Sequence, residues 1–295
     1  MNDKLDQLRK EYQEVPIPAE LDFVVDRAIT QSLKTRRSKS SKFKGLTAIG
    51  AAAVIFVTTI NASPTVANAL SSIPGVDRII KVLTLKEYVV DEPNYNADIK
   101  VPSIAHLENK ALEVGLNEKY FKESKELYDK FQAEINEIKK QGDGHLGLFA
   151  GYEVKTDNDD ILSIERYVEE IAGSSSTRIK IDTIDKKNQV LITLPMLFKD
   201  DQYIERISEN IKEQMRAQMA ADPEKVYWIP TDDEALMADA FTSIAKDQSF
   251  YINNAGKLVI VFNEYDVAPG YMGVVEFIIP TEVLSDDLVS HQYIK

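Results

Sequence analysis

The sequence has no cysteine, only three histidines and a single tryptophan among its 295 residues. The absence of cysteine excludes disulfide bonds, thiol catalysis and metal centres with cysteine ligands. His106, His145 and His291 lie far apart, without the spacing of a metal site. The chain also lacks a Gly-x-Ser-x-Gly motif, a phosphate-binding P-loop and a His-Glu-x-x-His motif. We therefore expect no enzyme activity, no cofactor and no metal. The many carboxylates keep a hydrolase as an alternative, although no particular pair of them indicates one.

One long stretch lacks charge: no Asp, Glu, Lys or Arg occurs from Gly45 to Val76. A helix over 43–62 would be about 30 Å long, enough to cross the hydrocarbon core of a bilayer. Its large apolar residues contribute only about −2 to −4 kcal/mol on the insertion scale, so the span is marginal. We predict a transmembrane helix of the signal-anchor type over 45–62. The alternative is a buried helix of a soluble protein.

The flanks of this span predict its orientation. Residues 34–44 form a basic juxtamembrane linker with six Lys/Arg and no acidic residue, whereas the first charge beyond the span is Asp77. The positive-inside rule then places the N-terminus in the cytoplasm and the larger C-terminal part outside the cell membrane. An exported part without disulfides is typical of a Gram-positive surface.

The span is followed by "NASPTVANALSS", residues 61–72. Pro64 ends the helix, and Ala67 and Ala69 form the small-x-small pair behind which a signal peptidase cuts. Cleavage would therefore separate Ala69 from Leu70. We predict a cleavage-site and juxtamembrane segment over 63–83, in which Leu70, Ile73, Val76, Ile80 and Leu83 recur at helical spacing.

Charge is unevenly distributed along the chain. The whole chain carries a net charge of −13. Residues 1–44 carry +3, so the remainder carries −16. An acidic surface repels the phosphates of nucleic acid, which we exclude as a partner. The same surface attracts and steers a basic protein.

The cytoplasmic segment, residues 1–33, reads as two short helices separated at Pro16 and Pro18. In the second helix, one apolar stripe follows helical spacing: Leu21, Val24, Val25 and Ala28. So short a segment cannot bury a core of its own. We expect the stripe to dock on a cytoplasmic protein; the alternative is a loosely ordered tail that only orients the membrane helix.

The exterior is predicted to be α+β with antiparallel sheets, because helices and strands come in blocks rather than in strict alternation. We expect a pair of small α+β domains, over 84–192 and 193–295. The first would contain a long amphipathic helix near 109–141 and two hairpins, one turning at Asp185–Asn188. The second would contain a helix near 201–223 and a strand meander from 249.

One exterior stretch, "EYDVAPGYMG", combines a tight turn at Pro269-Gly270 with Tyr271 and Met272 immediately after it. Tyrosine and methionine are enriched at protein interfaces. This turn is therefore a candidate binding site. The alternative is a turn whose tyrosine folds back onto the sheet.

Several long segments make the family recognisable. They include "LDQLRKEYQEVPIPAELD", "LNEKYFKES", "TIDKKN", "NIKEQM", "DPEKVYW" and "EYDVAPGYMG", together with the internal span and its Ala-x-Ala exit. The chain resembles the RsiV-type anti-sigma factors, lysozyme-sensing inhibitors of an extracytoplasmic-function sigma factor, over essentially its whole length.

The resemblance implies partners on both sides of the membrane. The cytoplasmic segment would hold the sigma factor inactive through Leu21, Val24, Val25 and Ala28. The exterior would bind lysozyme through Pro269, Gly270, Tyr271 and Met272, with a weaker candidate set at Ser174, Ser175 and Ser176. Ligand binding would permit signal-peptidase cleavage and then cutting by an intramembrane site-2 protease. The alternative function is a membrane-anchored cell-wall-binding or carbohydrate-processing module.

Overall fold

The computed structural model describes residues 80–142, 144–230 and 240–295. All of them belong to one compact unit. The predicted sigma-binding residues, the transmembrane helix, and the cleavage residues Ala67, Ala69 and Leu70 lie outside the described residues. No helix among those described is long and apolar enough to cross a membrane.

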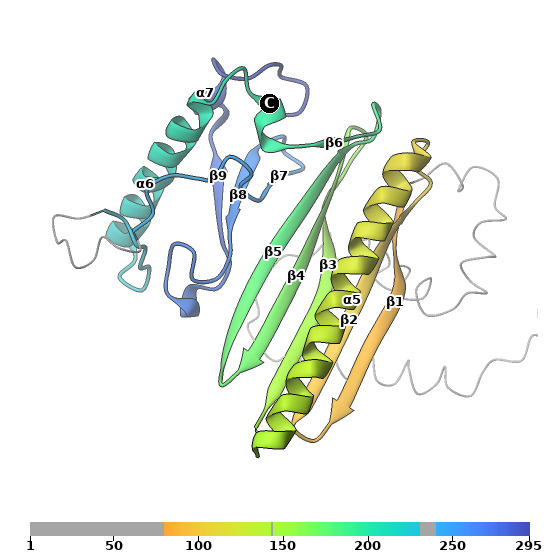
Figure 1. Cartoon of the computed structure of the whole chain (residues 1–295). Helices are drawn as coiled ribbons and strands as arrows, with labels where there is room; N and C mark the ends of the chain where they lie inside the picture. The colour runs from red at the N-terminus through yellow and green to blue at the C-terminus, as the bar shows by residue number, and fades with distance from the viewer. Residues whose placement is uncertain (1–79, 143, 231–239) are drawn as a thin grey trace, which may run out of the picture. The chain divides into compact units, whose positions relative to one another are not determined.

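A six-stranded sheet occupies the first half of the described chain, with its strands in sequence order (Figure 1). The strands are β1 (Lys81–Glu92), β2 (Tyr95–Ala105), β3 (Leu146–Asp157), β4 (Ile161–Ala172), β5 (Ser174–Asp185) and β6 (Val190–Ile192). Short turns connect the antiparallel pairs β1–β2, β3–β4, β4–β5 and β5–β6. Both predicted hairpins are present, and the turn between β5 and β6 falls where the polar Asp185–Asn188 segment predicts it.

The pair β2–β3 is parallel, which differs from the predicted purely antiparallel sheet. Its register runs from Tyr95 opposite Leu146 to Ile99 opposite Ala150. The long helix α5 (Lys110–Gln141) lies between these strands in sequence. It returns the chain to the end of the sheet at which β2 begins, so that β3 can run in the same direction as β2. A crossover of this length is what a parallel connection requires.

Helix α5 confirms the helix predicted near 109–141. The side chain of Asn109 caps its first turn by accepting a hydrogen bond from the amide of Leu112 at 3.2 Å. Lys139 and Lys140 lie in the last turn, where positive charge complements the helix dipole. One face of the helix is buried over the sheet, and its buried residues are Leu116, Tyr120, Ser124, Phe131 and Ile135.

A second group of elements follows the six-stranded sheet. It consists of a short 3₁₀ helix at Leu194–Leu197, α6 (Gln202–Ala221), a three-stranded antiparallel sheet and α7 (Thr281–Leu284). The strands of this sheet are β7 (Phe250–Ile252), β8 (Leu258–Phe262) and β9 (Val275–Ile279). Helix α6 buries Tyr203, Ile207, Ile211 and Met215 in the core that it shares with this sheet. The α+β class with antiparallel sheets is thereby confirmed, apart from the β2–β3 pair.

Side chains from the two sheets pack against each other. Ile179 of β5 lies in one buried cluster with Tyr251, Val259 and Val261. Beside this cluster, Lys155 pairs with Glu276 at 3.0 Å, and the Tyr251 hydroxyl donates to the same carboxylate at 2.9 Å. Burial and this hydrogen bond raise the pKa of Tyr251 to about 12. The two sheets are therefore joined by both apolar and charged contacts.

The end of the predicted helical stripe is wrong where the structure can be compared with it. Residues 81–83 belong to strand β1, not to a helix ending at Leu83. Ile80 and Val82 pack against the buried cluster that contains Leu162 and Ile164. In a strand, residues two positions apart have their side chains on the same face, so Ile80 and Val82 can both face the core. Pairing with β2 favours this strand over the helix that the apolar spacing predicts.

Candidate functional site

The candidate site is the turn that follows β8. Pro269 precedes a single 3₁₀ turn, Gly270–Met272. The amide of Met272 donates to the carbonyl of Pro269, and the amide of Gly273 to that of Gly270, both at 2.9 Å. Gly273 has a φ of +64°, which L side chains adopt only with strain. The predicted tight turn is therefore present and is held by its own backbone hydrogen bonds.

Tyr271 lies at the surface, with 68% of its surface exposed. Its hydroxyl donates to the backbone carbonyl of Glu224 at 3.0 Å, which fixes the direction of the side chain. Met272 is only partly exposed and packs against the core of α6 and the three-stranded sheet. Of the two predicted contacts at the tip, Tyr271 presents the accessible surface, and Met272 anchors the turn.

Tyr265 is a second exposed tyrosine beside the turn, with 47% of its surface exposed and a positive φ of 69°. Its ring lies over Gly270 so closely that a Cβ atom at that position would collide with the hydroxyl end of the ring. Glycine at position 270 therefore permits the contact between ring and turn. Tyr265 was not among the predicted site residues, although it lies within the segment "EYDVAPGYMG".

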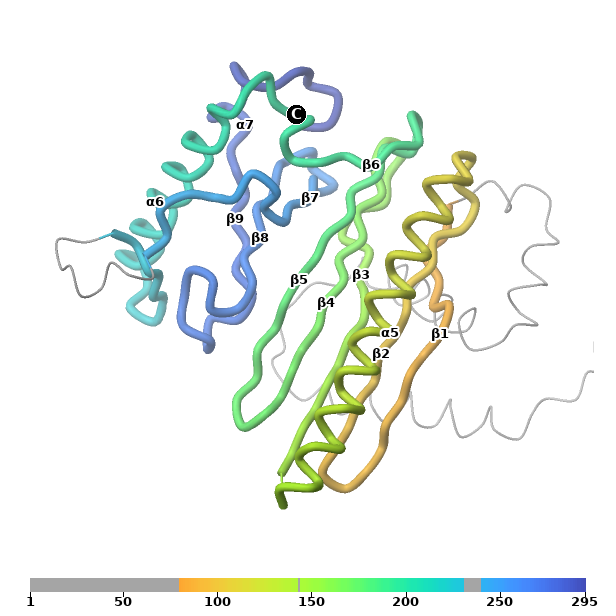
Figure 2. The backbone as a smooth tube through the Cα atoms, viewed as in Figure 1, coloured from red at the N-terminus to blue at the C-terminus, as the bar shows by residue number. Residues whose placement is uncertain are grey.

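The residues just before the turn are hydrogen-bonded to the edge of β5. The carboxylate of Glu264 accepts from the amide of Thr177 at 2.9 Å, and the Glu264 amide donates back to the Thr177 carbonyl at 3.1 Å. The side-chain oxygen of Asn263 accepts from the amide of Ile179 at 2.7 Å. Figure 2 shows this return of the chain beside β5. The turn is thus fixed to the six-stranded sheet as well as to its own strands.

The predicted serine set lies at the start of the same strand. Ser174 and Ser175 are exposed and Ser176 is half-buried, directly before Thr177. The serines make none of the hydrogen bonds to the turn segment themselves; Thr177 makes them. The serine set and the turn residues are about 90 residues apart in sequence. The structure nevertheless places them on two segments that are hydrogen-bonded to each other through Thr177 and Glu264.

Acidic groups surround the turn. Glu224 and Asp266 are exposed, and Glu264 is half-buried. Asp266 accepts from the amide of Asn263 at 2.8 Å and so stabilises the bend that leads to Tyr265. The described residues contain no group of three His, Asp or Glu side chains placed to hold a metal ion. The turn thus presents aromatic surface within an acidic border.

Comparison with solved structures supports the fold. A family model described as a protein of unknown function (DUF3298) matches residues 196–282. A DUF3298 protein from Pseudomonas aeruginosa PAO1 aligns with a TM-score of 0.53 and 12% identity, over 75% of this chain and 100% of its own. A DUF3298 member from Bacteroides fragilis NCTC 9343 aligns at 0.50 and 18%, over 72% and 94%. At such low identities these likenesses concern the fold alone.

A sequence relative determines the family. The anti-sigma-V factor RsiV of Bacillus subtilis strain 168 is 46% identical over 295 residues, which cover 100% of both chains. The chain belongs to the RsiV family of anti-sigma factors. The resemblance inferred from the sequence segments is thereby confirmed. Members of the RsiV family regulate transcription, and the exposed turn around Tyr271 belongs to such a regulator.

Proposed function

We propose that the chain is a membrane-anchored anti-sigma factor whose exterior is a lysozyme receptor. The full-length identity of 46% to an anti-sigma-V factor supports the inhibitory role. The exposure of Tyr271 on a rigid turn carries the receptor half of the proposal. Signalling requires no catalytic residue in this chain, because the proteases that cut it supply the chemistry.

On the cytoplasmic side, the proposed contact is the stripe Leu21, Val24, Val25 and Ala28. Helical spacing of apolar residues in a segment too short to bury them supports docking on a sigma factor. The basic linker and the uncharged span after it support a single membrane crossing with the N-terminus inside.

On the outer side, lysozyme is the proposed ligand of the turn that contains Pro269, Gly270 and Tyr271. Lysozyme is strongly basic, and the chain beyond Lys44 carries a net charge of −16. Charge of opposite sign mainly accelerates association, whereas affinity requires a buried anchor. Tyr271 provides the anchor, because its ring has a large surface and the hydroxyl contact with Glu224 already restricts its rotation. Ser174, Ser175 and Ser176 extend the proposed contact along the neighbouring β5 edge.

The proposed switch is cleavage between Ala69 and Leu70. Only about ten residues separate that bond from Ile80, which packs into the core beneath α5. A chain of this length reaches at most about 35 Å, so the bond stays near the folded exterior. We propose that the apolar residues Leu70, Ile73 and Val76 pack on the free exterior and hide the bond. Lysozyme can release them only to the extent that it binds the open state more tightly.

Two experiments test the two halves separately. The purified exterior, residues 70–295, should retain lysozyme in a pulldown. Failure to retain it would refute the proposal that the exterior is a lysozyme receptor. For the inhibitory half, Leu21→Asp combined with Val25→Asp should activate a sigma-dependent reporter without lowering the protein's level. Unchanged repression would remove the proposed docking stripe.

We also propose that the exterior comprises two domains, 84–192 and 193–295, with the six-stranded and three-stranded sheets as their respective cores. Limited proteolysis near residue 193 that yields two folded fragments would support this division. Cooperative loss of both sheets in one transition would contradict it.

A further inference from the structure

A cleft with a volume of about 330 Å³ lies between α5 and strands β2–β5. It has a clear origin in the topology. Hydrogen bonding between β2 and β3 ends at Ile99 and Ala150, although both strands continue beyond that point. Helix α5 lies along the fork between the two strands and provides one wall of the cleft. The volume is within the range of small-molecule sites in proteins.

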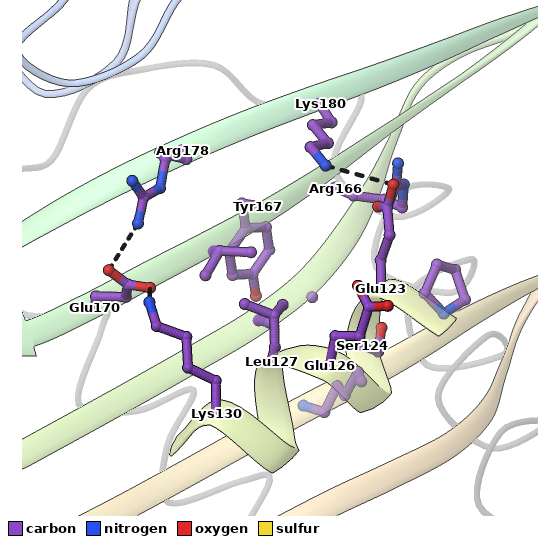
Figure 3. A pocket seen from close by; sticks show the side chains of 15 residues that line it. Glu123, Ser124, Glu126, Leu127, Lys130, Arg166, Tyr167, Glu170, Arg178 and Lys180 are labelled. Carbon is purple, nitrogen blue, oxygen red and sulfur yellow. Dashed lines mark hydrogen bonds and ion pairs between the residues drawn. The ribbon is translucent and has the colours of Figure 1, made fainter. Parts of the chain in front are cut away.

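Two charged clusters lie at the ends of this cleft (Figure 3). In one, the carboxylate of Glu170 lies 2.7 Å from Arg178 and 3.8 Å from Lys130. In the other, the carboxylate of Glu123 lies 2.6 Å from Arg166 and 3.4 Å from Lys180. In each cluster two cations share one carboxylate, so each end has one positive charge in excess.

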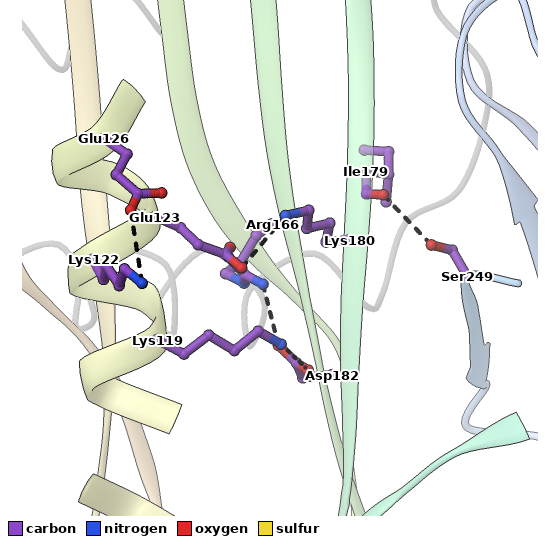
Figure 4. A network of polar contacts seen from close by, with 9 residues as sticks. All are labelled: Lys119, Lys122, Glu123, Glu126, Arg166, Ile179, Lys180, Asp182 and Ser249. Carbon is purple, nitrogen blue, oxygen red and sulfur yellow. Dashed lines mark hydrogen bonds and ion pairs between the residues drawn. The ribbon is translucent and has the colours of Figure 1, made fainter. Parts of the chain in front are cut away.

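Further charged side chains contact the second cluster, among them Asp182 and Lys119 (Figure 4). Arg166 is almost completely buried, its guanidinium stacks on the ring of Tyr120 at 4.4 Å, and it also pairs with Asp182 at 3.4 Å. Lys119 neutralises Asp182 at 2.9 Å. Burial alone would raise the pKa of Glu123, but the hydrogen bond and charge of Arg166 hold it below its usual value. The excess positive charge at this end therefore persists when the supporting groups are included.

Apolar side chains lie between the two clusters. Leu127 of α5 lies there (Figure 3), and Val168 of β4 and Ala150 of β3 also line the cleft. Tyr167 of β4 packs on the opposite face of the sheet, against the cluster that contains Ile179 and Tyr251. Gly151 makes room for its hydroxyl, because a Cβ atom there would lie 2.5 Å from that oxygen. An apolar centre between two cationic ends fits an elongated molecule better than a compact ion.

Three of the cationic side chains are exposed and therefore available to a ligand. The side chains of Lys130, Arg178 and Lys180 are 67%, 60% and 67% exposed, so their present ion pairs are weak and exchangeable. The cleft as a whole is lined by five cationic and three acidic side chains, in a part of the chain that is otherwise strongly acidic. A positive cleft on a negative protein concentrates small anions.

We infer that this cleft binds a small elongated dianion with a carboxylate at each end and an aliphatic middle. One carboxylate lies between Lys130 and Arg178, the other against Lys180 beside Arg166, and the middle packs on Leu127 and Val168. This site is separate from the turn around Tyr271 and does not depend on lysozyme being the ligand there.

The test uses the full-length protein in detergent micelles and a series of linear dicarboxylates: glutarate, adipate and suberate. Calorimetry should give saturable binding to one site, with affinity that depends on chain length. Hexanoate or octanoate, each with one carboxylate, should bind at least about tenfold more weakly than the best dicarboxylate. Methyl resonances of Leu127 and Val168 should shift on titration. Absence of saturable binding, or equal affinity for acids with one and two carboxylates, would overturn the inference.

Exposed-lysine variants locate the site without threatening the fold. Lys130→Gln and Lys180→Gln should each reduce the dicarboxylate affinity about tenfold, to that of the acid with one carboxylate. Lys140→Gln, at the exposed end of the same helix, is the matched control and should leave affinity unchanged. Lysozyme binding should be the same in all three variants, so that failure here is distinguishable from failure of the receptor proposal. Equal affinity in Lys130→Gln, Lys180→Gln and the unmodified chain would show that the dianion binds elsewhere.

Discussion

Glu264 and Thr177 are joined by two hydrogen bonds: carboxylate to amide at 2.9 Å, and amide to carbonyl at 3.1 Å. Through this pair, the segment that leads to the exposed turn is fixed to strand β5, which begins with Ser174. A ligand that contacts both segments therefore meets a surface that is already assembled. Preassembly reduces the entropy lost on binding.

Removing the Glu264 carboxylate should loosen this surface. Glu264→Ala loses the bond to Thr177, and we expect about 1 kcal/mol less stability and several-fold weaker lysozyme binding. Glu264→Gln retains a side-chain carbonyl oxygen that can accept from the same amide and serves as the control. On the exterior, residues 70–295, calorimetric titration with lysozyme measures the affinity, and denaturant titration measures the stability. Equal affinities for Glu264→Ala and the unmodified exterior would show that the link does not position the turn.

Tyr271 should carry more of the affinity than any neighbour. Tyr271→Ala removes an exposed ring, so we expect thermal unfolding to change little. Lysozyme affinity should fall by about thirtyfold, corresponding to about 2 kcal/mol for an anchoring aromatic. Tyr271→Phe loses only the hydroxyl contact with Glu224, and most of the affinity should remain. If Tyr271→Ala binds lysozyme as tightly as the unmodified exterior, the ligand occupies another surface.

Gly270 should be intolerant of a side chain. A Cβ atom in Gly270→Ala meets the Tyr265 ring, so either the ring or the turn must move. We expect a stability loss of about 1–3 kcal/mol together with weaker lysozyme binding. Adding Tyr265→Ala should relieve the strain and restore stability. Gly115→Ala is the matched control, because a Cβ atom there meets nothing within 4 Å. Equal stability of the Gly270→Ala and Gly115→Ala proteins would refute the contact.

The stability of the exterior should depend on pH through Asp185. Burial would raise the pKa of this carboxyl, but hydrogen bonds from Tyr293, Asn188 and Lys187 hold it below its ordinary value of 3.8. The lowered pKa means that the carboxylate stabilises the folded state at pH values above 3.8. That contribution is lost as the pH falls from 3.8 through the lowered value.

Asp185→Asn isolates this contribution. At pH 6 the variant should unfold with a free energy about 2 kcal/mol lower, because a carboxylate that accepts several hydrogen bonds is replaced by a neutral amide. The difference should shrink below about pH 4. Denaturant titrations at several pH values measure it, and a difference that does not change with pH would show that Asp185 is not the responsible group.

Local patterns predicted most of the elements. Asp185–Asn188 marked its hairpin turn through side chains that bond to nearby amides, and α5 followed from apolar residues on one helical face. Contacts between distant segments were less predictable. The parallel β2–β3 pair depends on how α5 crosses the sheet, and Lys81–Leu83 joined a strand because β2 lies beside it.

The candidate site shows the same division. The tight turn at Pro269-Gly270 was predicted from its residues, whereas the sequence left open whether Tyr271 is exposed or folds back onto the sheet. The role of Tyr265 could not be predicted, because it depends on a positive φ and on space over Gly270. The link between Thr177 and Glu264 joins residues 87 positions apart, which no local pattern reveals.

The proposed switch is tested most directly by sequencing the N-terminus of the exterior fragment released from membranes that carry the full chain. Without lysozyme, little fragment should appear. With lysozyme, a fragment beginning at Leu70 should accumulate, and Ala69→Trp should abolish it because a signal-peptidase pocket accepts only small side chains. A fragment that begins elsewhere, or that appears at the same rate with and without lysozyme, would contradict the account.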